Sequence, residues 1–127
     1  MTPDPFVQGD KWTRQIVWCN PKPGSSAHHP QPDLDNPVDI TGWTARLQFR
    51  RDSTVAFTLT SATGGGLVIT GDTGTIVCAA TPAQTELLIP GTWGWELELS
   101  LVQDGTLVDR QTIYTERLQV RRQVTTP

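Results

Sequence analysis

The sequence predicts an all-β fold: a single immunoglobulin-like or jelly-roll-type antiparallel β-sandwich of about seven or eight strands, with one short helical turn. Three observations lead to this prediction. Several segments alternate apolar and polar residues with a period of two, as strands with one buried face do. Turn residues are frequent, with 11 glycines and 10 prolines. The 127 residues are typical of one domain, so residues 1–127 are expected to form a single sandwich domain.

The first predicted strand covers residues 10–19, where Trp12, Ile16 and Trp18 share one parity. Residues 20–36 follow, and they are too polar and too rich in proline for regular structure, so we expect a long exposed loop. Loops of this length are often functional, which makes this one the best candidate for partner contact. The candidate partner-binding residues are Lys22, His28, His29, Gln31 and Asp33.

The clearest strand lies in residues 37–50, which combine a turn, a strand start and a strict two-residue alternation. One side carries Trp43, Ala45, Leu47 and Phe49, and the other carries Thr44, Arg46, Gln48 and Arg50. This pattern is typical of a half-buried antiparallel strand, because strands of a parallel sheet are apolar on both faces. Val55, Phe57 and Leu59 predict a second strand with these three side chains facing inward.

A hairpin is predicted next, because residues 67–70 and 75–80 flank the turn Gly71-Asp72-Thr73-Gly74. Residues 81–88 are the only helical candidate: Thr81 can cap the helix, and Pro82 suits its first position. Residues 93–101 alternate strongly and predict another strand. Asp104-Gly105 then turns the chain into two further predicted strands, residues 107–113 and 117–124.

Glu96 and Glu98 lie two residues apart on the polar side of one strand, roughly 7 Å apart. Two carboxylates at such a distance could serve a glycosidase. The favoured interpretation is that they are solvated or paired across strands with residues such as Arg46 and Arg50. Because no recognised catalytic arrangement occurs elsewhere, we expect no catalytic residues and no enzyme activity.

The adjacent residues His28 and His29 could suggest a metal pair, but neighbours in an extended loop point apart, so an exposed polar loop is favoured. Cys19 and Cys78 fit no zinc spacing and are expected to be reduced, half-buried thiols. A disulfide formed after cell lysis is an alternative if their strands are neighbours. No metal or other cofactor is expected.

Five tryptophans could form a sugar-stacking platform, which would need at least two of them exposed and coplanar. The inward parity of Trp43, Trp93 and Trp95 instead favours core positions.

The formal net charge of −3 argues against a nucleic-acid partner, which would normally meet a basic stripe. The N-terminal residues lack the basic and apolar regions of a signal peptide, and no apolar run approaches the roughly 18 residues that span a bilayer. We therefore expect synthesis and folding in a cytoplasm, with no membrane partner.

Four segments together carry a family resemblance. They are VQGDKW at 7–12, PVDITGWTARLQ at 37–48, GTWGWELEL at 91–99 and LQVRRQVT at 118–125. This set resembles small virion proteins of tailed bacteriophages and prophages, and is similar to the N-terminal β-sandwich domain of phage upper-baseplate proteins. The segments span nearly the whole chain and consist of strand starts and turns.

The resemblance implies a non-enzymatic structural protein of the virion, located in the tail, baseplate or fibre-attachment region. It implies synthesis in the cytoplasm of a bacterial host and assembly with other virion proteins, as a homo-oligomer in the particle. Two alternatives stay open: a decoration or cement protein bound to major capsid subunits, and a glycan-binding module that holds the host surface.

Overall fold

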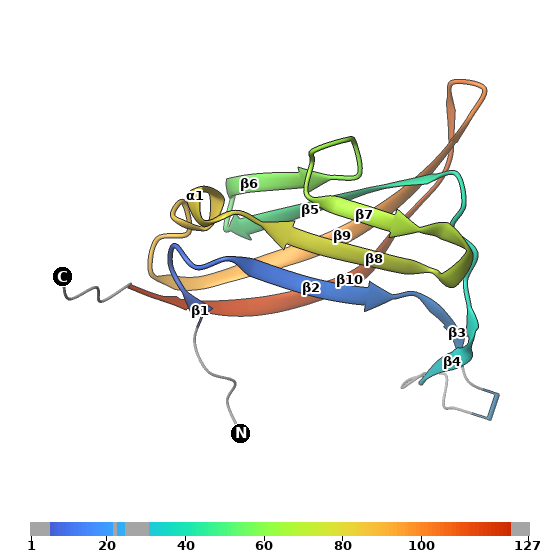
Figure 1. The fold of residues 1–127 in the computed structure, drawn as a ribbon, viewed down its shortest axis with the longest axis horizontal. Helices are drawn as coiled ribbons and strands as arrows, with labels where there is room; N and C mark the ends of the chain where they lie inside the picture. Colours follow the sequence, from blue (N-terminus) through green and yellow to red (C-terminus); the bar gives the residue numbers. More distant parts are fainter. Residues whose placement is uncertain (1–5, 22, 25–30, 123–127) are drawn as a thin grey trace.

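The computed structural model describes residues 6–21, 23–24 and 31–122, and it confirms the all-β prediction (Figure 1). Two sheets pack against each other, and a small third sheet extends from one end. The five-stranded sheet has the order β1 (Phe6–Val7), β10 (Thr106–Arg121), β9 (Gly91–Gln103), β5 (Trp43–Arg51) and β6 (Thr54–Thr60). The three-stranded sheet has the order β2 (Trp12–Val17), β8 (Thr75–Ala80) and β7 (Leu67–Thr70), and the two-stranded sheet pairs β3 (Cys19–Pro21) with β4 (Pro32–Pro37).

The strand count differs from the predicted seven or eight, since ten strands occur in the part of the chain that the structure describes. One reason is that the expected loop 20–36 is partly regular: β3 and β4 pair antiparallel, with Cys19 opposite Pro37 and Pro21 opposite Pro32. The Asn20 side chain also donates a hydrogen bond to the Asn36 carbonyl at 3.2 Å. The short β1 adds a parallel pair, with Phe6 opposite Val120.

The two strands predicted from residues 107–124 form one long strand, β10. Its ladder with β9 is interrupted between Leu107 and Asp109 and again between Thr112 and Tyr114. Each interruption inserts one extra residue and so reverses which side of the strand the following residues occupy. The alternation therefore changes phase although the strand continues, which is why two strands were predicted. A similar irregularity, between Phe49 and Arg50, leaves Val55 exposed rather than inward.

The core lies between the two larger sheets and has an aromatic centre. Trp12 of β2 meets Phe49 of β5 and Trp95 of β9 edge to face, at 5.0 and 5.2 Å between ring centroids. The predicted core positions of Trp93 and Trp95 are confirmed, whereas Trp43 is half-buried at the rim. Trp43 packs there against Trp18 with the ring planes at 87°.

Side chains and turns join the two sheets at both lateral edges. At one edge the Arg14 guanidinium of β2 forms an ion pair with the Glu116 carboxylate of β10, with 3.2 Å between nitrogen and oxygen. At the other, Thr60 at the end of β6 donates to the Gly65 carbonyl at 2.9 Å, and Ala79 of β8 donates to Gly66, also at 2.9 Å. The core is therefore bordered by contacts on both sides rather than open at an edge.

The predicted hairpin and helical turn are both present. A 3-10 turn, Gly71–Thr73, joins β7 to β8. The helix α1 (Pro82–Thr85) is shorter than the predicted 81–88, but Thr81 caps it as expected. The Thr81 hydroxyl accepts a hydrogen bond from the Gln84 amide at 3.2 Å, and the Gln84 side chain accepts one from the Thr81 amide at 2.9 Å.

Candidate interaction surfaces

Two of the five candidate contact residues, Gln31 and Asp33, are described by the structure, and they lie at the β3–β4 end of the molecule. Lys22, His28 and His29 lie outside the described residues. Gln31 is exposed and borders a hollow of about 340 Å³. Asp33 lies on β4 and is half-buried, and its carboxylate accepts a hydrogen bond from the Asp35 amide at 3.2 Å. Asp33 thus belongs to a strand rather than to the expected loop, whereas Gln31 directly precedes that strand.

The carboxylates Glu96 and Glu98 lie on the outer face of the five-stranded sheet. Glu98 faces Arg46 across β5 and β9, as predicted, with 3.3 Å between guanidinium and carboxylate. It also lies 3.4 Å from Arg110 of β10. Glu96 faces Gln48 instead of Arg50, because Arg50 lies opposite Gly94. The arrangement around Glu98 is thus a carboxylate held between two arginines.

A shallow depression lies on the same face, directly over Gly94. We call it the Gly94 notch, and its volume is about 300 Å³. It is lined by Arg50, Gly94, Trp95, Glu96, Thr115, Glu116 and Arg117. The strand register places Arg50 of β5 and Arg117 of β10 opposite Gly94, one on each side. Since Gly94 has no side chain, the two arginines border an empty position on the middle strand.

A second candidate surface is the end of the β9–β10 hairpin, which projects beyond the rest of the sandwich (Figure 1). We call residues 101–110 the arm. Its tip is the turn Asp104-Gly105, in which both residues have positive φ, 51° and 77°. Val102, Leu107 and Val108 are all about half exposed there. Apolar side chains are therefore presented on a projecting element.

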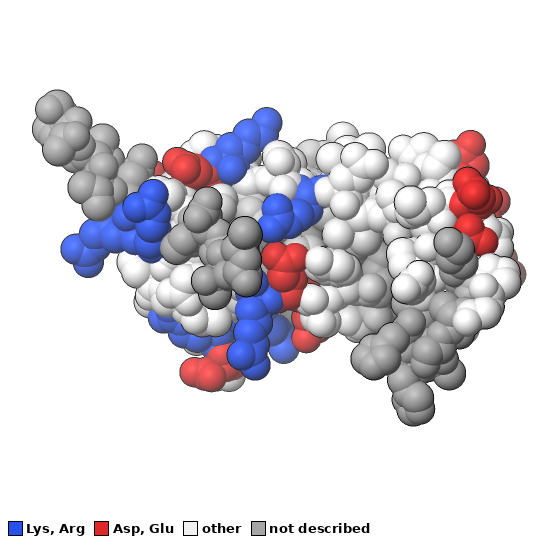
Figure 2. Space-filling model, turned by 90° about the horizontal axis from the view of Figure 1, so that it is seen from below, with Lys and Arg blue, Asp and Glu red and all other residues white. Residues whose placement is uncertain are grey.

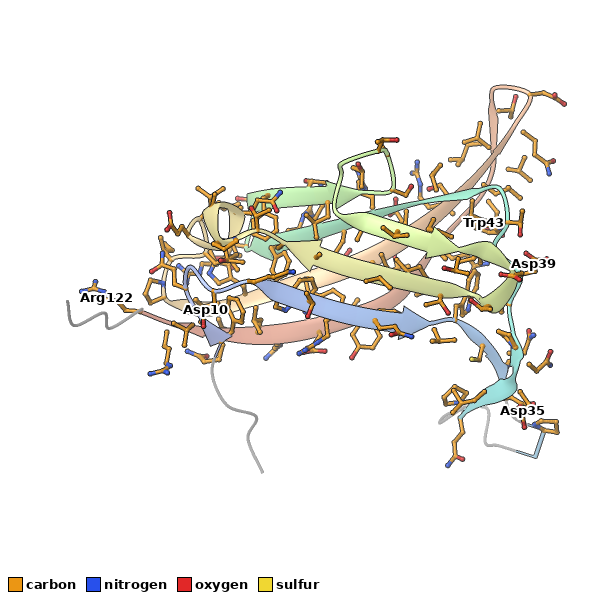
Figure 3. The ribbon with its side chains drawn as sticks, viewed as in Figure 1. Asp10, Asp35, Asp39, Trp43 and Arg122 are labelled. Carbon is orange, nitrogen blue, oxygen red and sulfur yellow. The ribbon has the colours of Figure 1, made fainter. Side chains whose placement is uncertain are left out.

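The two ends of the long axis differ in charge. On the face that Figure 2 shows, Lys and Arg side chains lie over one half and the centre of the molecule, with Asp and Glu side chains among them, whereas the described charged side chains at the opposite end are acidic. Figure 3 places Asp10 and Arg122 at the first end and Asp35 and Asp39 at the other. Each end also carries exposed apolar side chains: Leu34 lies beside Asp35, and Ile89 follows α1.

The five tryptophans, all of which are described, do not form an exposed coplanar pair. Trp12, Trp93 and Trp95 are buried, and the half-buried Trp18 and Trp43 are perpendicular to each other. A sugar-stacking platform needs parallel exposed rings, so this arrangement gives no support to the glycan-binding alternative.

Both cysteines are free thiols. Cys19 is half-buried as predicted, but Cys78 is fully buried, because its parity on β8 points it into the core with Ile76 and Ala80. Burial raises the pKa of the Cys78 thiol to about 11. At the β4–β5 junction, hydrogen bonds from the Thr41 side chain and backbone amide lower the pKa of Asp39.

Within residues 6–21, 23–24 and 31–122, no group of three or more His, Cys, Asp or Glu side chains is arranged to hold a metal ion. No helix in those residues is long and apolar enough to cross a membrane.

No protein-family model matches this chain, and no curated protein is similar to it. Its surfaces must therefore be interpreted from their own chemistry.

Sequence reasoning missed both the Gly94 notch and the arm. Gly94 interrupts the polar side of the strand 93–101, and this signal could have drawn attention to it. The position of Arg117 beside Gly94 depends on the irregularities of β10, which the alternation conceals. The arm could not be distinguished from an ordinary hairpin, because its projection depends on where the neighbouring strand β5 begins, at Trp43 opposite Leu101.

Proposed function

We propose that this chain is a non-enzymatic structural protein of a bacteriophage virion, a tail, baseplate or fibre-attachment component that assembles with other virion subunits. The phage assignment rests on the family resemblance of the strand starts and turns. The general class, a subunit of an assembly, is supported by the arm and by the unequal ends of the molecule.

The arm is the observation that carries the proposal. Val102 and Leu107 lie opposite each other on β9 and β10, and Val108 occupies the adjacent irregularity. Each is about half exposed, at 50%, 46% and 55%, on an element that extends away from the core. Exposed apolar side chains gathered on a projecting hairpin are typical of a surface that a neighbouring subunit covers.

The charge difference between the ends gives independent support. A subunit with one acidic end and one end of mixed charge meets its neighbours in a preferred orientation, because opposite charges attract and like charges repel across a contact. The exposed Leu34 and Ile89 add apolar area at the two ends. Ordered stacking of subunits requires such an oriented contact.

The proposal is tested by locating the protein in virions produced by the replicon that encodes it, using electron microscopy of particles carrying a tagged copy. We expect density at the tail, baseplate or fibre attachment. Density on the capsid surface would instead establish a decoration protein, and absence from purified particles would overturn a virion role.

A variant of the arm makes the test specific to the geometry. Val102→Thr, Leu107→Thr and Val108→Thr together keep strand-forming side chains while removing apolar surface, so we expect a folded protein with strongly reduced incorporation. The matched control is Val68→Thr with Val77→Thr, which removes exposed valines from the outer face of the three-stranded sheet. Equal incorporation of both variants would contradict a role for the arm.

A further inference from the structure

We propose that the Gly94 notch is a binding site for a carboxylate group, presented by an aspartate or glutamate side chain of a protein partner. The identity of the source as a neighbouring subunit rests on the proposed function, whereas the site itself rests on the contacts of the outer sheet face. Three observations carry the proposal. Two arginines at the notch form no ion pair with a described residue, a nearby glutamate on the same face is paired with two arginines, and the fold does not require glycine at position 94.

The first observation concerns the arginines. Arg50 and Arg117 lie on either side of Gly94, on strands two apart in the sheet and thus roughly 10 Å apart at their backbones. In the described part of the chain, neither guanidinium lies within ion-pair distance of a carboxylate, although Arg14, Arg46 and Arg110 all do. The notch therefore contains two arginines that form no ion pair with any described residue. Two carboxylates also line it: Glu96, and Glu116, which is paired with Arg14.

The second observation is that the same sheet face contains a carboxylate paired with arginines of both neighbouring strands. Glu98 of β9 lies between Arg46 of β5 and Arg110 of β10, at 3.3 and 3.4 Å. Arg46 lies directly opposite Glu98, whereas Arg110 lies opposite Ser100 and reaches Glu98 diagonally, so the two arrangements are similar but not identical. A carboxylate from outside the chain could join Arg50 and Arg117 in the same way, because arginine pairs readily with planar carboxylates.

The third observation is that the fold does not require glycine at position 94. Its φ is not among the positive values of the chain. An added Cβ would meet only the Arg50 carbonyl, at 3.9 Å, which is an ordinary contact. Glycine weakens a strand interior, and it often marks a position where a ligand or another backbone approaches closely. Any larger side chain would begin to fill the notch.

The surroundings favour a single carboxylate over phosphate. Glu96, on the next outward position of β9, also lines the notch. Its negative charge opposes an incoming anion, and it opposes a phosphate dianion more than a monoanion. Because the notch is shallow and exposed, one free carboxylate would bind weakly, so the ligand is a side chain held in place by a larger protein contact.

The test is an NMR titration of the ¹⁵N-labelled chain with N-acetyl-glutamate amide, which carries one side-chain carboxylate, and separately with inorganic phosphate. We expect saturable shifts, in the millimolar range, at the Gly94 amide and at the Nε–H signals of Arg50 and Arg117. Phosphate should give smaller shifts. Shifts no larger than those at the exposed Arg121 and Arg122 would overturn the site, and larger shifts with phosphate would overturn the choice of carboxylate.

Two variants provide a second, independent readout. Gly94→Glu supplies the missing carboxylate from within, so it should abolish the shifts and raise the urea midpoint relative to Gly94→Gln, which has the same bulk without the charge. The excess stability of the Glu variant should shrink in high salt, because an exposed ion pair is screened. Equal midpoints of the two variants, with the probe still bound, would contradict the proposal.

These measurements separate the two proposals. Probe binding by a chain that is absent from virions would overturn the proposed function and leave the site intact. Virion incorporation without probe binding would overturn the site alone.

Discussion

Among single residues, Cys78 shows most directly how position determines chemistry. The sequence predicts two half-buried thiols, yet one is fully buried and the other is half-buried. The cause is parity, since Cys78 shares the inward side of β8 with Ile76 and Ala80. The low polarity around the buried thiol disfavours its ionised form and so raises its pKa.

This raised pKa predicts a pH-dependent stability. Above pH 9.0, the ordinary pKa, the unfolded thiol loses its proton, while the folded thiol keeps its proton up to about pH 11. The folded state then binds more protons, so the free energy of unfolding falls by about 1.4 kcal/mol per pH unit in this window. Urea unfolding at pH 8 and pH 10.5 checks this against Cys78→Ala.

Cys78→Ala is a suitable comparison because Tyr114 is present in both proteins. A hydrogen bond to Glu116 raises the pKa of Tyr114, which therefore titrates at high pH in each. The difference between the two slopes isolates Cys78. Parallel pH profiles for the two proteins would contradict the prediction.

At the scale of elements, the accuracy of prediction depends on whether local chemistry determines the structure. The β7–β8 hairpin and the Thr81 cap were predicted correctly, because turn and capping residues act on their immediate neighbours. The continuous strand β10 and the pairing of β3 with β4 were not predicted. Their pairing depends on strand irregularities and on partners distant in sequence, and alternation along one segment does not report these. The arrangement of Arg50 and Arg117 around Gly94 was missed for the same reason.

The glycine that ends the β7–β8 turn tests the packing of the smaller sheet. Gly74 has φ 63°, and an added Cβ would lie 2.6 Å from the carbonyl oxygens of both Trp18 and Val38. Gly74→Ala should therefore destabilise the protein by about 3 kcal/mol, through backbone strain and the clash together. Thermal or urea unfolding measures the loss.

Gly105 is the matched control at the arm tip. Its φ is also positive, at 77°, but an added Cβ would meet nothing within 4 Å. Gly105→Ala should cost only about 1 kcal/mol, the strain alone. If the two alanine variants were equally stable, close packing around Gly74 would be refuted as the source of the larger effect.

At the scale of the whole molecule, two packed sheets separate an acidic end from an end of mixed charge and support an arm at one corner (Figures 1 and 3). The all-β class follows from composition and alternation, both of which are properties of the chain as a whole. The distribution of charge along the long axis does not, because it depends on which strand ends lie together. The net charge of −3 conceals this asymmetry.

The stretch that contains most of the predicted contact residues can be tested at this scale. Replacing residues 22–31 by Asn-Gly joins β3 to β4 directly, and their pairing suits a short connection. We expect a far-UV circular dichroism spectrum and a melting temperature close to those of the full chain, with weaker incorporation into particles. Normal incorporation would show that these residues only connect the two strands.

The continuity of β9 and β10 has a mechanical consequence. β9 has 13 residues and β10 has 16, and both extend into the arm. At about 3.4 Å per residue, β9 alone spans roughly 44 Å. If the arm tip were pulled away from the opposite end, the force would act along the strands and shear all β5–β9 hydrogen bonds at once. A force across the strands would instead break these bonds one after another. Loaded along the strands, the β5–β9 bonds resist together, so the long strands should withstand a lengthwise pull better than a sideways one.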